Sequence, residues 1–172
     1  KELFRAANTF LGHRRGGLGI ATIAACGGFA AISGSSVATA ATFSTVAYPE
    51  MRRFGYPQSF ATGVIAAGGT LGAMLPPSTV LAVYAIITQQ DIGKLFIAGV
   101  LPGMMLTFML CVVTWWLARK HDFPRLPKAT WGRSWTTFRQ SIWGLMLVVI
   151  IIGGIYSGAF TATEAAAVAA VY

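Results

Sequence analysis

The chain has 172 residues, of which 55% are hydrophobic and only 10% are charged, whereas about a quarter of the residues of an average soluble domain are charged. Its 13 Lys and Arg residues against five Asp and Glu give a net charge of +8, but the basic residues gather at the ends of long uncharged tracts. That distribution is typical of membrane topology and argues against nucleic acid as the partner.

The uncharged tracts, taken in chain order, predict the architecture. A helix needs about 20 apolar residues to span a bilayer, and four tracts reach that length: 16–49, 54–90, 95–118 and 140–163. The sequence therefore predicts an all-α, multi-pass membrane protein embedded in a lipid bilayer. Because the chain begins at Lys1 without an initiator Met and stops at Tyr172 within an Ala-rich run, we expect it to be a fragment of a longer protein.

A re-entrant helical hairpin is predicted at 18–47, after a lead-in at 1–17 on the cytoplasmic side. The segment is too long for one upright span and too short for two, and a Ser-Gly-Ser-Ser cluster at 33–36 interrupts its middle. Arginine pairs flank the hairpin at 14–15 and 52–53, which favours a cytoplasmic location for both ends. One long tilted helix with its serines facing a neighbour is the alternative, but it moves one arginine pair to the opposite side.

The next tract, 59–88, is predicted to cross the membrane as a broken helix. Pro76 and Pro77 have no amide hydrogen, so the carbonyls of Gly72 and Ala73 lose their helical partners. In hydrocarbon, a broken backbone persists only where protein buries it or where it lines a polar cavity. The segments 18–47 and 59–88 are therefore taken together as one predicted unit, 18–88.

Small residues on either side of the proline pair extend this prediction. Gly68, Gly69 and Gly72 are expected to let the backbone unwind and another element approach closely. A second half-helix is expected to begin at Ser78 and Thr79, with the positive end of its dipole facing the break. Freed carbonyls suit Na⁺ and half-helix N-termini suit an anion, and discontinuous helices with these two uses mark the binding sites of secondary transporters. A kink that serves helix packing alone is the simpler alternative.

The rest of the chain alternates across the membrane. A transmembrane helix is predicted at 95–118 and a second at 140–158, joined by a basic cytoplasmic loop at 119–139 that holds six Lys and Arg residues against one Asp. Three aromatic residues with helical spacing indicate an interfacial helix in this loop: Trp131, Trp135 and Phe138.

The last segment, 161–172, is predicted to start a second hairpin. Thr161 and Glu164 fit a capping box before an apolar run. This segment enters the membrane from the face opposite to that of the first hairpin, as an inverted-topology repeat requires.

Five stretches of this chain resemble the large membrane subunit of tripartite ATP-independent periplasmic (TRAP) transporters. They are "AAISGSSVATAAT", "PEMRRFGY", "ATGVIAAGGTLGAMLPPSTVLAVYAIIT", "IGKLFIAGVLPG" and "GAFTATEAAAVAA". The family often has Thr-Pro-Thr-Glu where this chain has Thr-Ala-Thr-Glu at 161–164, a difference we expect to be mild because proline at a first helical position is only a convenience.

The resemblance implies a function and partners. It implies Na⁺-driven uptake of an organic acid, such as a C4-dicarboxylate or a sugar acid, in the bacterial inner membrane. It also implies an elevator-like movement of a transport domain, of which 18–88 would be a segment. It also implies two protein partners, a small membrane subunit and a periplasmic substrate-binding protein, and no organic cofactor.

The resemblance places one Na⁺ site and part of the substrate site at the hairpin and the proline break. The residues implied for Na⁺ are Ser33, Gly34, Ser36, Gly69, Thr70, Gly72 and Pro76. The residues implied for the substrate are Ser35, Ser36, Thr39, Ser78 and Thr79.

Other classes fit the sequence less well. An intramembrane serine protease needs a base near its serine, but His13 and His121 lie in basic stretches outside the apolar tracts. No P-loop motif is present for ATP, and Cys26 and Cys111 are expected to be packing residues. We therefore expect no enzyme. A Na⁺/dicarboxylate symporter without a binding protein and, with less support, a channel stay as alternatives.

Overall fold

A computed structural model describes residues 16–121 together with Met146, Ile150, Gly153, Gly154, Ser157 and Glu164. Within 16–121 the chain is helical, and its elements are α2 (Gly17–Ser33), α3 (Ser36–Arg53), α4 (Gln58–Met74), α5 (Thr79–Thr88) and α6 (Ile92–Lys120). The described part thus agrees with an all-helical membrane protein. The predictions for 1–15, 122–139 and 161–172, and most of the predicted helix 140–158, lie outside the described residues.

At the predicted re-entrant hairpin the structure has two helices, α2 and α3, that pack against each other. Gly34 ends α2 in the left-handed conformation, with φ 60°, and its N–H donates to the carbonyl of Ala30 at 2.9 Å. Ser35 is extended and caps α3 by accepting a hydrogen bond from the Ala38 amide at 3.3 Å. One continuous helix over 18–47 is therefore wrong. The second arm is longer than expected, since α3 runs through Pro49 to Arg53.

Over the predicted broken helix the structure has two helices, α4 and α5, separated at residues 75–78. The expectation that the glycines unwind the backbone is wrong, because α4 is helical through Gly68, Gly69 and Gly72 and ends only at Met74. Leu75 still donates to Leu71 at 2.8 Å, and the chain leaves the helix there in an extended conformation. The proline pair, joined by a cis peptide bond, is therefore what stops the helix.

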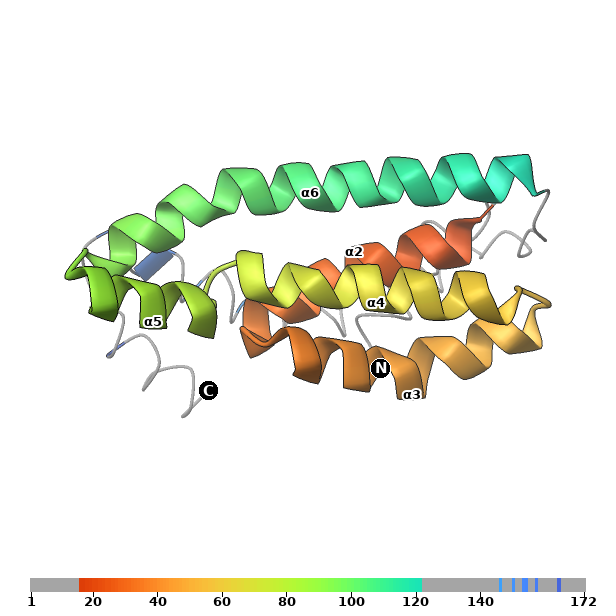
Figure 1. Cartoon of the computed structure of the whole chain (residues 1–172), viewed down its shortest axis with the longest axis horizontal. Coiled ribbons are helices and arrows are strands. Elements are labelled where there is room, and N and C mark those ends of the chain that lie inside the picture. The colour runs from red at the N-terminus through yellow and green to blue at the C-terminus, as the bar shows by residue number, and fades with distance from the viewer. Residues whose placement is uncertain are drawn as a thin grey trace.

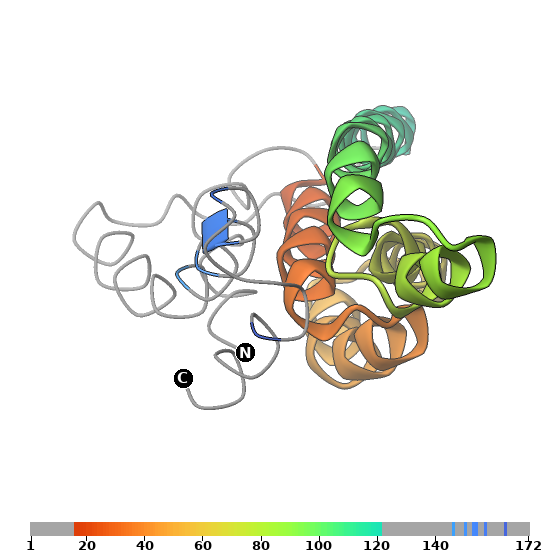
Figure 2. The same cartoon turned by 90° about the vertical axis from the view of Figure 1, so that its left-hand side faces the viewer.

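The helices form a bundle around α2 and α4 (Figure 1). α3 and α6 lie on opposite sides of the α2–α4 pair, and α5 turns away from α4 to pack against α6 (Figures 1 and 2). The bundle core consists of side chains from α2, α3, α4 and the loop between α3 and α4, with Ala118 of α6; among them are Leu18, Ile23, Phe43, Met51, Tyr56 and Leu71.

Two stretches of the described chain are long and apolar enough to cross a membrane: Gln58–Thr88 and Ile92–Lys120. Their outward side chains are large and apolar, as in Ile87 of α5 and Phe108 of α6, which are 75% and 70% exposed. α2 is apolar but shorter. The hairpin tip between α2 and α3 lies alongside the break in the stretch Gln58–Thr88.

Candidate ion and substrate site

The two helix breaks meet in space, although the residues that join them, Gly34 and Thr79, are 45 positions apart in sequence. Thr79, the first residue of α5, donates two hydrogen bonds to the carbonyl of Gly34 at the hairpin tip. One comes from its amide at 3.2 Å and the other from its hydroxyl at 3.1 Å. We call residues 33–36 and 72–79 together the junction.

Glycines make this contact possible. A Cβ on Gly72 would lie 2.5 Å from the carbonyl oxygen of Ser35 and 2.7 Å from the amide nitrogen of Ser36, distances at which no side chain fits. A Cβ on Gly69 would lie 2.9 Å from Cβ of Ala40. On the hairpin side, a Cβ on Gly34 would collide with the carbonyl oxygen of Pro77. The prediction that small residues in α4 allow another element to approach closely is therefore confirmed.

Ser78 closes part of the break. Its buried hydroxyl caps α5 by accepting from the Leu81 amide at 3.4 Å, and it donates to the carbonyl of Ala73 at 2.7 Å. Of the two carbonyls expected to lose their partners, that of Ala73 has therefore gained a new one, and the expectation of a free carbonyl is wrong there. The carbonyl of Gly72 still lacks its helical partner, because Pro76 carries no N–H.

Hydroxyl groups join the two arms of the hairpin beside its tip. Thr39 is fully buried, and its hydroxyl donates to the carbonyl of Ser35 at 2.7 Å. The Ser33 and Thr39 hydroxyl oxygens lie 3.1 Å apart. Since a hydroxyl has one hydrogen and that of Thr39 is used, Ser33 is the donor in this pair. The Ser35 carbonyl also accepts from the Thr39 amide at 3.1 Å.

The predicted site residues other than Ser33, Thr39, Ser78 and Thr79, which are described above, fall into three groups. The carbonyls of Gly34 and Ser35 each accept two hydrogen bonds already, which uses both lone pairs of each oxygen. The Ser36 hydroxyl makes no hydrogen bond within the described residues, and Gly69, Gly72 and Pro76 are buried at or near the tip. Thr70 alone points elsewhere: it is exposed on α4, and its hydroxyl donates to Ala67 at 2.7 Å.

The junction is electrically neutral apart from backbone dipoles. Within 16–121 the only carboxylates are Glu50, in the last turns of α3, and Asp91, which caps α6 by accepting from the Lys94 amide at 2.8 Å. A cation at the junction would therefore be held by hydroxyl and carbonyl oxygens, the ligands that hard cations prefer. An anion would be held by the N-terminus of α5 and by hydroxyl groups.

Two contacts of the junction could not be read from the sequence. The Thr79–Gly34 pair joins residues with no sequence relation, and the Ser78–Ala73 bond depends on how the chain leaves the helix at Leu75. The available signal was the Pro-Pro-Ser-Thr run itself, since Ser and Thr directly after a proline break predict capping roles.

The sequence of the whole chain has clear relatives. Residues 1–172 match the family described as "Tripartite ATP-independent periplasmic transporter, DctM component". The chain is 52% identical over its full length to the C4-dicarboxylate TRAP transporter large permease protein DctM of Pseudomonas aeruginosa, covering 40% of that protein. It is 46% identical to the protein of the same name in Rhodobacter capsulatus, covering 42% of it.

A further relative differs in its substrate. The chain is 39% identical over its full length to the sialic acid TRAP transporter permease protein SiaT of Haemophilus influenzae, covering 28% of it. The chain thus spans about two fifths or less of the length of these curated relatives. Because the family match covers the entire chain, the chain belongs to the DctM component family of the tripartite ATP-independent periplasmic transporters.

Proposed function

We propose that the protein to which this chain belongs takes up an organic acid by secondary transport driven by a Na⁺ gradient. The observation that carries the proposal is the meeting of two helix breaks, where the hairpin tip lies against the proline break and Thr79 bonds Gly34. Discontinuous helices of this kind hold the ions and substrates of secondary transporters. The neutral oxygens at the junction suit Na⁺ better than they suit a softer metal.

The substrate class is a C4-dicarboxylate or a related organic acid. The relatives at 52% and 46% identity are named for C4-dicarboxylates, whereas the relative at 39% is named for sialic acid. The N-terminus of α5, capped by Ser78, offers a positive dipole end at the junction. We assign Ser35, Ser36, Thr39, Ser78 and Thr79 to the part of the substrate site that this chain supplies.

For Na⁺, the proposal gives first place to the Ser36 hydroxyl and the Gly72 carbonyl. Both lie where the tip touches α4, and neither is used by the hydrogen bonds described above. Ser33, Gly34, Gly69 and Pro76 surround this position, and Thr70 is assigned to the opposite side of the same helix.

The proposal includes a re-entrant hairpin and an elevator-like movement. If Gln58–Thr88 crosses the membrane, the tip lies beside residue 72, about 20 Å along α4 at about 1.5 Å per residue, so the hairpin reaches only part of the way across. The hairpin and α4 share one core, which supports their moving as one body. A small membrane subunit, which like this chain lies in the bacterial inner membrane, and a binding protein in the periplasm complete the proposed transporter.

Uptake by the reconstituted full-length protein tests this function. We expect accumulation of a C4-dicarboxylate only with an inward Na⁺ gradient and only when a purified periplasmic binding protein and the small subunit are present. Uptake that needs Na⁺ but no binding protein would favour the simple symporter. Flux of solute without counterflow would favour a channel.

A further inference from the structure

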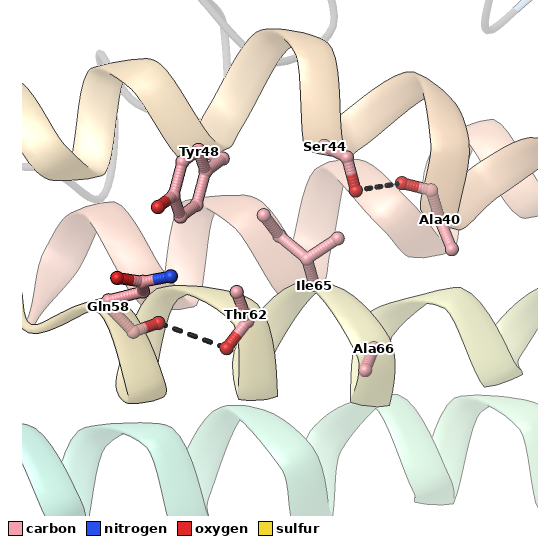
Figure 3. A pocket seen from close by; sticks show the side chains of 7 residues that line it. All are labelled: Ala40, Ser44, Tyr48, Gln58, Thr62, Ile65 and Ala66. Atoms are coloured by element: carbon pink, nitrogen blue, oxygen red, sulfur yellow. Dashed lines mark hydrogen bonds between the residues drawn. The ribbon is translucent and has the colours of Figure 1, made fainter.

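An open groove lies between α3 and α4, on the face of this helix pair opposite α2 (Figure 3). Its volume is about 340 Å³. The lining side chains come from successive turns of the two helices: Ala40, Ser44 and Tyr48 of α3, and Gln58, Thr62, Ile65 and Ala66 of α4. The groove begins next to the junction, because Ala40 also contacts Gly69.

The exposed face of α3 beside this groove does not suit lipid. Apart from Val37 in its first turn and Pro49, its exposed residues are small, hydroxylated or basic, as at Ala38, Ala41, Ser44, Thr45 and Arg52. The exposed faces of α5 and α6 carry large apolar side chains instead. Small residues and hydroxyl groups within a membrane protein face other helices or polar cavities rather than lipid tails.

The hydrogen bonds within the groove leave a defined pattern for a ligand. The Ser44 hydroxyl donates to the carbonyl of Ala40 at 2.8 Å, and the Thr62 hydroxyl donates to the carbonyl of Gln58 at 3.0 Å (Figure 3). Since each hydroxyl has a single hydrogen, both oxygens offer only lone pairs to the groove. The middle of the groove therefore accepts hydrogen bonds from a ligand.

The two ends of the groove differ from its middle. At one end, the Tyr48 phenol and the Gln58 amide provide donors. Arg52 lies one turn beyond Tyr48 on α3, and its guanidinium donates to the carbonyl of Tyr56 at 3.1 Å, so a positive charge stands near that end. At the other end, the lining side chains of Ala40, Ile65 and Ala66 are apolar.

We propose that this groove is a binding station for a hydroxylated organic acid. A carboxylate would accept from Tyr48 and Gln58, a hydroxyl of the solute would donate to Ser44 or Thr62, and the carbon chain would lie toward Ile65. The inference rests on the proposed transport function and adds a second position for the solute, between the junction and the arginine end of the hairpin. Because Tyr48 and Gln58 are neutral and Arg52 lies only near the groove, we expect the groove to bind the solute weakly and transiently.

The first test compares two probe solutes, malate and succinate, which differ by one hydroxyl group. In the reconstituted full-length transporter, the double variant Ser44→Ala with Thr62→Val should lower the ratio of malate to succinate uptake about three- to tenfold, as expected for lost hydrogen bonds. Thr45→Val is the matched control, because Thr45 is exposed on the same helix and donates within it, to Thr42 at 2.8 Å, without lining the groove. A double variant whose ratio equals that of the control would overturn the proposal.

A second measurement does not depend on transport. Thr62→Cys and Thr45→Cys, each in a cysteine-free background, are labelled with a maleimide in the purified full-length protein with and without malate. Malate should slow labelling at position 62 and leave position 45 unchanged. Equal rates with and without malate at both positions would identify the groove as a helix-packing surface and overturn the proposal. Absence of Na⁺-driven uptake in the wild type would instead count against the proposed function, and position 62 would still report on the groove.

Discussion

The hairpin tip and the break between α4 and α5 both interrupt a helix, yet different residues end the helix at each. At the tip, Gly34 adopts a left-handed conformation with φ 60°, which an L side chain rarely adopts. At the other break, Pro76 and Pro77 remove the amides that the next turn needs. The tip therefore depends on a conformation that glycine permits, and the second break depends on hydrogen bonds that proline forbids.

This difference predicts opposite responses to alanine. Alanine in place of Gly34 opposes the native conformation, so it should destabilise the fold. Alanine in place of the prolines restores amides that can bond the carbonyls of Gly72 and Ala73, so it should favour a continuous helix. Alanine substitution therefore distinguishes the two breaks. It disrupts the break that depends on the backbone conformation of Gly34, and it removes the break that depends on the missing amide hydrogens of Pro76 and Pro77.

The largest effect on transport is expected from Pro76→Ala with Pro77→Ala. Each proline costs about 3 kcal/mol within a helix, and lipid offers the Gly72 carbonyl few other partners. The double variant should fold at least as well as the wild type but lose Na⁺-coupled uptake, because Ser78 and Thr79 would become interior residues of a helix. Melting temperature and uptake measured on the same reconstituted samples test this.

The competing view of the prolines as a packing kink predicts the reverse pattern. Packing would worsen, the melting temperature would fall, and transport per folded molecule would drop only modestly. Near-normal coupled transport with lowered stability would therefore contradict a binding role for the break.

Gly34→Ala should give the largest loss of stability, and Gly55→Ala is its matched control. Both glycines have positive φ, 60° and 79°, so both substitutions carry the backbone cost of about 1–2 kcal/mol. Only at Gly34 would the new Cβ also collide with the Pro77 carbonyl, since the space around Gly55 is open. We expect the melting temperature to fall clearly further for Gly34→Ala. Equal losses in the two variants would mean that the tip does not need its close contact with the break.

These two breaks also mark how far the sequence predicts the structure. The break positions follow from Gly34, Pro76 and Pro77, because their backbone chemistry acts locally. The pairing of Gly34 with Thr79 does not follow, since these residues are 45 positions apart and meet only when α2 and α3 dock on α4. The continuity of α4 through its glycines was mispredicted because tertiary packing against the hairpin compensates for their low helix propensity.

The candidate site is predictable to a similar degree. Ser33, Ser36, Gly72 and their neighbours were predicted to act together, and the fold brings most of them to one place. Which oxygens already accept hydrogen bonds could not be predicted, because the acceptors of the Thr39 and Ser78 hydroxyl groups are fixed only by the folded structure. The groove between α3 and α4 was missed, although Ala40, Ser44 and Tyr48 recur every four residues in the sequence.

A moderate effect is expected from Thr79→Val, which removes one of the two hydrogen bonds between the breaks. The amide bond from residue 79 to the Gly34 carbonyl would persist, so we expect a stability loss of about 1 kcal/mol and a several-fold lower rate of coupled uptake. Thr79→Ser keeps the hydroxyl and should restore most of that rate. Thr88→Val is the control on the same helix, because its hydroxyl bonds only Tyr84, at 2.8 Å. If Thr79→Ser were as impaired as Thr79→Val, the methyl group rather than the hydroxyl would explain the loss.

The smallest effect is expected from Ser36→Ala, which distinguishes the ion from the architecture at the same junction. The Ser36 hydroxyl makes no hydrogen bond within the described residues, so its removal should leave the melting temperature within about 1 °C of the wild type, as for substitutions that touch no structural contact. If this oxygen is one of several Na⁺ ligands, the Na⁺ concentration for half-maximal uptake should rise about threefold or more, while the maximal rate changes little. Ser59→Ala, at an exposed serine in the first turn of α4, controls for the loss of a hydroxyl elsewhere in the same unit. An unchanged Na⁺ dependence would exclude Ser36, at the start of α3, from the ion site. The Gly72 carbonyl would then be the first candidate ligand, because it lacks a helical partner on account of Pro76 and independently of the hairpin.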